Sequence, residues 1–321
     1  MRDIKKIELH LHIEGAAPPA FVRGLAEEKH IDVSRVFRED GSYDFRGFSH
    51  FLQVYEAATS VLRTPEDYAR LTRAVLEEQA AQGVIYTEMF VSPDFCGGRD
   101  PAAWREFLLA IEEAARGVPG IEMRAIATCI RHFGPDKARE AAICAAETAG
   151  GFTVGFGMGG DEGQGRQGDF AWAFDCAREA GLGLTTHAGE WGGPESVREA
   201  LDDLRVSRIG HGVRAIEDPR LVERLAEDGV TLEVCPGSNV ALGVYSKIAS
   251  HPIERLREAG VPVTISTDDP PFFHTTMTGE YEALHAAFGW DEDVFAEVNR
   301  IAARAAFCDE ATRAGLLGEI G

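Results

Sequence analysis

A β-then-α alternation recurs along almost the whole chain and restricts its fold more than any other feature. Eight apolar stretches suited to strands are expected at Ile7–Ile13, Val84–Ser92, Glu122–Ile130, Phe152–Met158, Leu182–His187, Arg208–Val213, Thr231–Cys235 and Val261–Thr267. Amphipathic helices are expected at Ala102–Arg116, Asp136–Thr148, Asp169–Ala180, Pro194–Leu204, Pro219–Glu227 and Pro252–Ala259. Strands that alternate with helices in this way predict an α/β protein with a (β/α)8 TIM barrel rather than an open sheet.

Two segments of the chain are additional to the strands and helices of a minimal (β/α)8 barrel. The interval between the first two strands contains helical periodicity at Ala20–Lys29, Phe45–Leu62 and Glu66–Gln82. Because it follows the first strand, it leaves from the face where barrel enzymes keep their active sites, and we expect these extra helices to roof a pocket. The tail after Pro270 is also helical, notably over Asp293–Phe307. No linker interrupts the chain, so we predict a single barrel domain over residues 1–321.

The charge balance restricts the partners of the chain. Its 321 residues include 32 Lys and Arg against 53 Asp and Glu, a formal net charge of −21. Nucleic acids and anionic membrane surfaces are bound by basic faces, so neither is an expected partner. No run approaches the roughly 18 apolar residues of a membrane span, and the N-terminus lacks the apolar region of a secretory signal. Six cysteines without a CxxC pair indicate reduced thiols. We expect a cytoplasmic protein that acts on a small molecule, and leave self-association open.

The strongest local motif lies on the first strand. Because side chains alternate along a strand, His10, His12 and Glu14 share one face. Two imidazoles on one strand face suit a divalent metal such as zinc. The alternative for this pair alone is two ordinary histidines, either buried or facing solvent.

Three further strand ends carry polar residues that favour the metal interpretation. The fifth strand ends at His187 with Glu190 just beyond, the sixth at His211, and the eighth at Asp268 and Asp269. In a barrel these ends meet on one face. A closed structural site would need no neighbouring acid–base groups, so the set indicates metal-bound water. The fourth strand has no lysine to bridge two metals, so we predict one zinc ion held by His10, His12, His187 and Asp268.

Three residues are left to act beside the metal. Glu190 lies three positions after His187 and can enter the pocket without being a ligand, and His211 can hold or deprotonate the water. Asp269 points away from its neighbour Asp268 and is free to bind substrate. The alternatives are a helix-terminal charge for Glu190 and an N-cap for Asp269.

Taken together, the motifs show a resemblance to the adenosine deaminase family of the amidohydrolase superfamily. The matching segments are His10-Leu11-His12 with Glu14-Gly15, Gly160-Asp161-Glu162, His187-Ala188-Gly189-Glu190, Gly210-His211-Gly212, Cys235-Pro236 with Ser238-Asn239, and Thr267-Asp268-Asp269-Pro270. They follow the order of the family over nearly the whole chain.

The resemblance implies roles around a purine ring. Glu190 would protonate N1, His211 would orient the attacking water, Asp269 would meet N7, and the Gly160 backbone N–H would bind N3. The family usually carries Asp at the position of Glu14, where the side chain contacts ribose. Glu14 is therefore a predicted substrate contact, and its extra length resembles relatives that act on free adenine.

The other motifs resemble the nucleoside enzymes more closely, notably Gly160-Asp161-Glu162 and Gly210-His211. We therefore predict zinc-dependent deamination of adenosine and deoxyadenosine to inosine and deoxyinosine, with release of ammonia, in purine salvage. The alternatives are adenine deamination to hypoxanthine, deamination of another aminopurine or a pterin, and a non-catalytic zinc- or purine-binding module.

Overall fold

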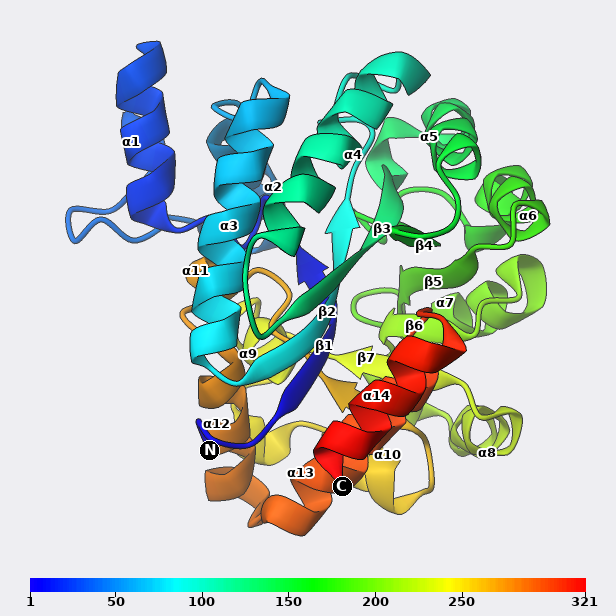
Figure 1. The fold of residues 1–321 in the computed structure, drawn as a ribbon. Helices are drawn as coiled ribbons and strands as arrows, with labels where there is room; N and C mark the ends of the chain where they lie inside the picture. Colours follow the sequence, from blue (N-terminus) through cyan, green and yellow to red (C-terminus); the bar gives the residue numbers. More distant parts are fainter.

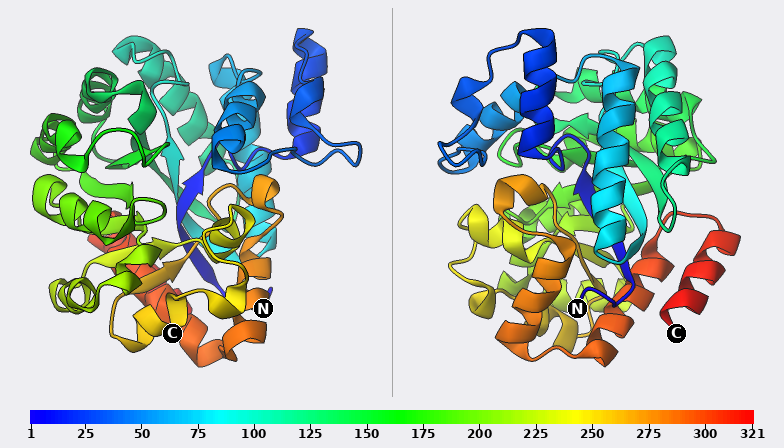
Figure 2. Two further views of the ribbon diagram at one scale, coloured as in Figure 1. Left: turned by 180° about the vertical axis from the view of Figure 1, so that it is seen from behind. Right: turned by 60° about the vertical axis from the view of Figure 1, so that its left-hand side comes forward.

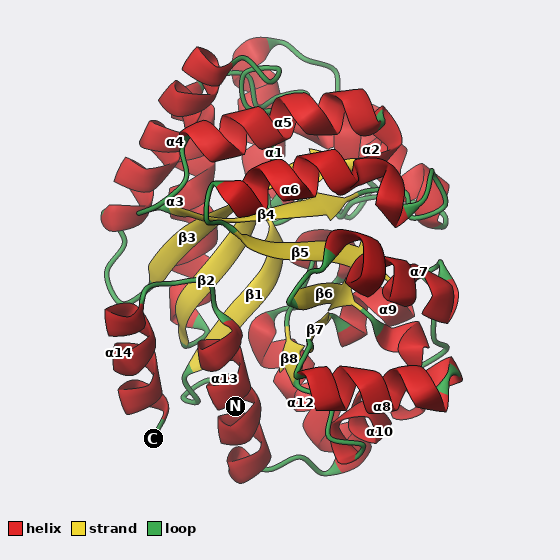
Figure 3. Cartoon of the chain, turned by 90° about the vertical axis from the view of Figure 1, so that its right-hand side faces the viewer, coloured by secondary structure: helices red, strands yellow, loops and turns green.

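Eight parallel strands in sequential order form the centre of the molecule. The computed structural model describes residues 1–321. The strands are β1 (Lys6–His12), β2 (Val84–Val91), β3 (Glu122–Ile130), β4 (Thr153–Gly159), β5 (Gly183–Ala188), β6 (Arg208–His211), β7 (Thr231–Val234) and β8 (Val263–Ile265), and they pair in the order β1 to β8. Figure 3 shows the strands enclosed by helices. The predicted (β/α)8 barrel is confirmed.

The barrel closes through backbone hydrogen bonds just beyond β8. The amide of Asp268 donates to the carbonyl of His10 at 3.1 Å, and the amide of His12 donates to the carbonyl of Asp268 at 3.1 Å. These bonds fix the position of Asp268 relative to β1. The side chains of all three residues therefore emerge at the C-terminal end of the strands.

The outer layer consists of helices that follow the strands. They are α4 (Pro101–Arg116), α5 (Pro135–Glu147), α6 (Ala171–Glu179), α7 (Gly193–Glu199), α8 (Pro219–Asp228) and α10 (Ile253–Glu258). Local sequence explains their ends: the Asp100 side chain caps the first amides of α4, and Gly229 ends α8 in the left-handed conformation. The main core packs between these helices and the barrel.

The connection from β1 to β2 contains three helices with different roles. They are α1 (Pro19–Lys29), α2 (Phe48–Thr59) and α3 (Pro65–Ala81). Helix α3 packs against α4 and β2 and so belongs to the outer layer. Helix α1 stands at the edge of the molecule (Figures 1 and 2). Of these three helices α2 lines the pocket, so the expected roof is formed by α2 and not by α1 or α3.

The remaining elements are short turns and the C-terminal helices. The helices are α9 (Pro236–Ala241), α11 (Pro270–Phe273), α12 (Met277–Phe288), α13 (Glu292–Ala305) and α14 (Glu310–Ile320), with 3-10 turns η1 (Ser34–Val36), η2 (Arg131–Phe133), η3 (Gln167–Phe170), η5 (Val213–Glu217) and η6 (Ile248–Ser250), and a π turn, η4 (Ala200–Leu204). Helix α13 packs against β1 and β8. All six cysteines are unpaired, and no helix has the length and apolarity that crossing a bilayer requires.

Candidate active site

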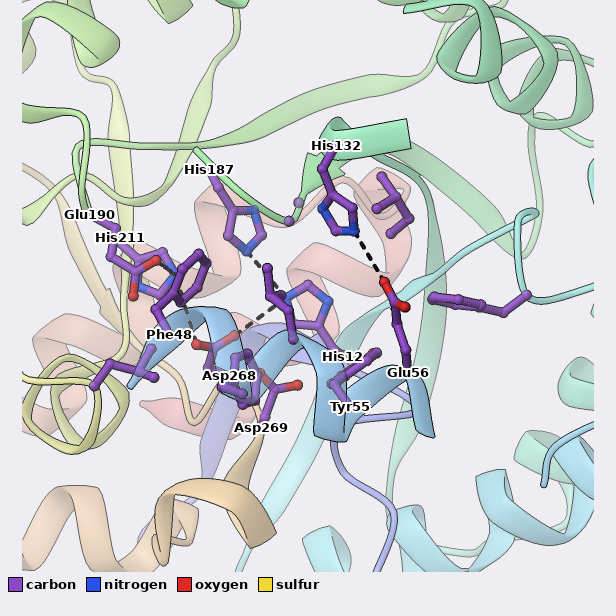
Figure 4. Close-up of a pocket in the computed structure, with 17 residues that line it drawn as sticks. His12, Phe48, Tyr55, Glu56, His132, His187, Glu190, His211, Asp268 and Asp269 are labelled. Carbon is purple, nitrogen blue, oxygen red and sulfur yellow. Dashed lines mark hydrogen bonds and ion pairs between the residues drawn. The ribbon is translucent and has the colours of Figure 1, made fainter. Parts of the chain in front are cut away.

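Four predicted ligands converge at the C-terminal mouth of the barrel. His10 and His12 come from β1, His187 from β5 and Asp268 from the turn after β8, and their candidate ligand atoms lie within 4.8 Å of one another. Asp268 Oδ1 lies 3.3 Å from His12 Nε2 and 3.5 Å from His10 Nε2. Ligand atoms about 2 Å from a tetrahedral zinc ion would stand about 3.3 Å apart. Figure 4 shows His12, His187 and Asp268 facing one another.

The hydrogen bonds of His10 and His187 leave a lone pair on each ring directed at the space between the four candidate ligands. His187 Nδ1 donates to the carbonyl of Met158 at 2.8 Å, so its Nε2 carries a lone pair, which lies 3.2 Å from His12 Nε2. His10 Nδ1 donates to Glu233 Oε2 at 2.8 Å, and the buried Nε2 of His10 has no hydrogen-bond partner. These lone pairs, and the hydrogen bonds that orient His10 and His187, suit a zinc ion.

Glu233 is itself held inside the barrel. Its Oε1 accepts from Arg208 Nε at 2.6 Å and from Thr185 Oγ1 at 3.0 Å. Arg208 also donates to Glu88 at 2.6 Å. The side chains of Glu88, Arg208 and Glu233 are at most 1% exposed, so their opposite charges compensate one another in the absence of water.

Two site residues adopt left-handed backbone conformations. His211 has φ 62° and Asp268 has φ 66°, values that are costly for residues other than glycine. The turns at these residues end β6 and β8 earlier than the sequence predicted. They also direct both side chains into the mouth of the barrel.

Glu190 lies on a loop whose backbone is organised by Glu162. The Glu162 carboxylate accepts from the amides of Gly189, Glu190 and Trp191 at 2.5, 3.1 and 2.6 Å. Burial, together with the negative charges of Asp268 and Glu162, raises the pKa of Glu190 well above its ordinary value. Glu190 therefore has the environment of a general acid. The sequence placed Glu162 in a motif without giving it this role.

His211 lies between Glu190 and the metal ligands. Its Nε2 is 3.8 Å from Glu190 Oε2 and 3.8 Å from Asp268 Oδ2, and its Nδ1 is 3.2 Å from the Asn239 amide nitrogen. Burial lowers the pKa of His211 to about 4, so the imidazole is neutral. The neighbouring Ser238 hydroxyl donates to Asp268 Oδ2 at 2.7 Å.

Asp269 and Gly160 face the pocket from two different loops. Burial and the adjacent Asp268 carboxylate raise the pKa of Asp269 well above its ordinary value, and its Oδ1 has no hydrogen-bond partner. The side chain rests on Gly15, where a Cβ atom would lie 1.5 Å from Oδ1. Gly160 has φ +100°, and a Cβ there would lie 2.7 Å from His132 Nδ1. Both glycines are therefore required by close approach.

The pocket extends from the metal ligands to the underside of α2, with an empty volume of about 620 Å³. Phe48, Phe51 and Tyr55 of α2 form an aromatic wall. At the mouth, Glu56 and His132 meet at 3.3 Å (Figure 4). A pocket that is mostly apolar, with a few convergent polar groups, is typical of small-molecule sites. The sequence analysis did not identify the wall residues, because their apolar spacing is also that of an ordinary buried helix face.

Glu14 is placed differently from the prediction. It is 4% exposed and is not among the residues that line the pocket. Its two oxygens accept from Tyr68 at 2.9 Å and from Tyr55 at 3.1 Å. Burial raises the pKa of Glu14 to about 7. Tyr55, rather than Glu14, presents its surface to the pocket.

The geometry agrees with comparisons to known proteins. The chain matches the adenosine deaminase family over residues 5–321. It belongs to this family. An adenine deaminase of Rhizobium rhizogenes is 51% identical over 319 residues, covering 99% of each chain, and one of Agrobacterium fabrum is 50% identical, covering 98% of each.

Solved structures of the family also resemble this fold. The adenine deaminase of Arthrobacter aurescens has a TM-score of 0.88 and 33% identity, covering 99% of this chain and 98% of its own. An amidohydrolase of Burkholderia ambifaria, solved with bound zinc, has a TM-score of 0.88 and 26% identity, covering 99% and 91%. The predicted family membership is confirmed, and the chain is a purine deaminase of the amidohydrolase class.

Proposed function

We propose that this protein hydrolyses adenine to hypoxanthine and ammonia with the help of one zinc ion. The choice of substrate depends on one observation: curated relatives that share about half of the sequence over its whole length are named adenine deaminases. The sequence analysis favoured adenosine, and this observation supports its stated alternative instead.

The surroundings of Glu14 supply a physical reason for the change. A carboxylate that bound ribose would need an oxygen that faces the pocket. Glu14 is buried and accepts from the phenols of Tyr55 and Tyr68, and Tyr55 rather than Glu14 lines the pocket. This arrangement favours a free base over a nucleoside.

His10, His12, His187 and Asp268 would hold the zinc ion. When bound there, zinc would lower the pKa of a water molecule so that hydroxide forms near neutral pH. The lone pairs described above, and the unpartnered Nε2 of His10 in particular, support this assignment.

The other site residues act on the purine ring. Protonated Glu190 donates to N1 while the oxygen nucleophile adds at C6, and His211 orients that nucleophile. Asp269 hydrogen bonds to N7, and the Gly160 amide binds N3. Of the two protons of the water molecule, one is transferred to the departing amino nitrogen and the other restores the acid form of Glu190. The balanced reaction is adenine plus water to hypoxanthine plus ammonia.

A direct assay tests the proposal. The zinc-loaded protein is given adenine, adenosine, deoxyadenosine and adenosine monophosphate, and the loss of absorbance on deamination is followed. The expected result is that kcat/KM for adenine exceeds that for adenosine. A higher kcat/KM for adenosine would restore the first prediction, and turnover of neither would refute the function. Metal analysis of the same sample should give about one zinc per chain.

A further inference from the structure

A chain of hydrogen bonds reaches the two acid–base residues, His211 and Glu190, through the side chain of Asn239. It begins at the backbone amide of Ile253, at the start of α10, which donates to His251 Nδ1 at 3.2 Å. His251 is 2% exposed, and burial lowers its pKa to about 3, so the ring carries one proton. Because Nδ1 accepts, that proton is on Nε2.

The proton on His251 fixes the orientation of Asn239. His251 Nε2 lies 3.1 Å from Asn239 Oδ1 and donates to it. A side-chain amide has one acceptor oxygen and one NH2 group with two donors. The NH2 group of Asn239 therefore faces the other way, where His211 Nδ1 lies at 3.2 Å and Glu190 Oε1 at 3.4 Å.

The NH2 group of Asn239 fixes which atom carries the proton in both His211 and Glu190. His211 Nδ1 accepts from Asn239, so the proton of the neutral imidazole is on Nε2. Glu190 Oε1 also accepts, which leaves Oε2 to carry the acidic proton. His211 Nε2 and Glu190 Oε2 are 3.8 Å apart and belong to residues that line the pocket. Two N–H or O–H donors are thus directed into the same space.

We infer that Asn239 and His251 are positioning residues, which hold His211 as an Nε2–H donor and Glu190 with its proton on Oε2. The inference rests on the proposed deamination. In it, His211 donates a hydrogen bond to the attacking oxygen and is not the base that removes a proton from water. The sequence left open whether His211 holds the water or deprotonates it. With its proton on Nε2, His211 holds the water.

The tautomer itself is the first measurement. In zinc-loaded protein labelled with 15N-histidine, His211 should show a protonated Nε2 and an unprotonated Nδ1. Asn239→Asp replaces the NH2 group by a carboxylate oxygen, so His211 should move its proton to Nδ1. Reversal of a catalytic imidazole tautomer in another enzyme class costs about 10⁴-fold in kcat, and we expect a loss of about 10²- to 10⁴-fold here. KM and zinc content should change little, because neither depends on this proton.

Matched variants distinguish the loss of a positioning hydrogen bond from a general loss of folding. Asn299 is also buried, holds Ile7 and Tyr281 through its Oδ1, and lies outside the pocket. Asn299→Asp makes the same chemical change and should keep kcat. His251→Phe removes the donor that orients Asn239 and should lower kcat about tenfold, whereas His251→Gln keeps an N–H donor and should lose less.

The outcomes distinguish this inference from the proposed function. An Nδ1-protonated His211 in the wild-type protein would overturn the inference, and this measurement needs no variant to fold. Retained kcat in a folded, zinc-loaded Asn239→Asp protein would also overturn it. Wild-type protein that deaminates no aminopurine would refute the function instead, and the 15N spectrum would still decide the tautomer.

Discussion

Replacement of Glu233 by glutamine should weaken zinc binding, although Glu233 is not one of the candidate zinc ligands. The Glu233 carboxylate accepts from His10 Nδ1 at 2.8 Å, and both side chains are fully buried. A hydrogen bond to a charged group contributes roughly 1.5–3 kcal/mol. Since about 1.4 kcal/mol corresponds to a tenfold change in a dissociation constant, the zinc affinity of Glu233→Gln should fall about tenfold to a hundredfold. In other metal sites, loss of a residue that hydrogen bonds to a metal ligand lowers the metal affinity by about the same factor.

The assay is competition for zinc with a chelator of known affinity, with folding followed by circular dichroism. Glu280→Gln is the matched control, because Glu280 is an equally buried carboxylate that holds the Gly237 amide and the Thr275 hydroxyl rather than a ligand. The control should bind zinc as the wild type does. If folded Glu233→Gln protein also bound zinc with wild-type affinity, the argument that Glu233 prepares His10 for the metal would be refuted.

Two further predictions follow from the buried carboxyl groups. Glu190→Gln keeps the shape of the acid but cannot give up a proton, so kcat should fall by about 10²-fold or more while zinc stays bound; turnover and metal content are measured on one sample. For Glu280, burial raises the pKa from 4.5 to about 7, so its neutral form adds stability below pH 4.5, and this contribution is lost as the pH rises through 7. The shift corresponds to about 3 kcal/mol. Denaturant titrations should therefore show that Glu280→Gln loses about that much less stability than the wild type between these pH values, and parallel curves would contradict the assignment.

The barrel and the convergence of the four candidate metal ligands were predictable, because their signals are local. Each strand is an apolar run, and parallel strands in a barrel must end on the same face, so His10, His12, His187 and Asp268 could be brought together without knowing a single contact. The ends of the strands were less predictable. β6 stops at His211 because the next turn needs positive φ at His211 and Gly212, a feature that apolar periodicity does not report.

The roles of the supporting residues were not predicted, because their partners are distant in sequence. Asn239 meets Glu190 across 49 positions, and Glu162 meets the Glu190 loop across 28. A partial signal does exist: Glu233 is a charged residue inside the apolar run Thr231–Val234, and Arg208 begins another strand. A charge buried in a parallel strand must be paired or bound to something, so these two residues could have been matched with each other.

Glu14 is the predicted substrate contact that the structure places outside the pocket lining. The strand period predicts that its side chain points toward the mouth of the barrel. In the structure, two tyrosines that lie 41 and 54 positions further along the chain donate hydrogen bonds to its carboxylate. Tyr55 belongs to α2 and Tyr68 to α3, so the surroundings of the Glu14 carboxylate depend on how the β1–β2 connection packs. The extra methylene of glutamate lets the carboxylate satisfy both phenols while it remains buried.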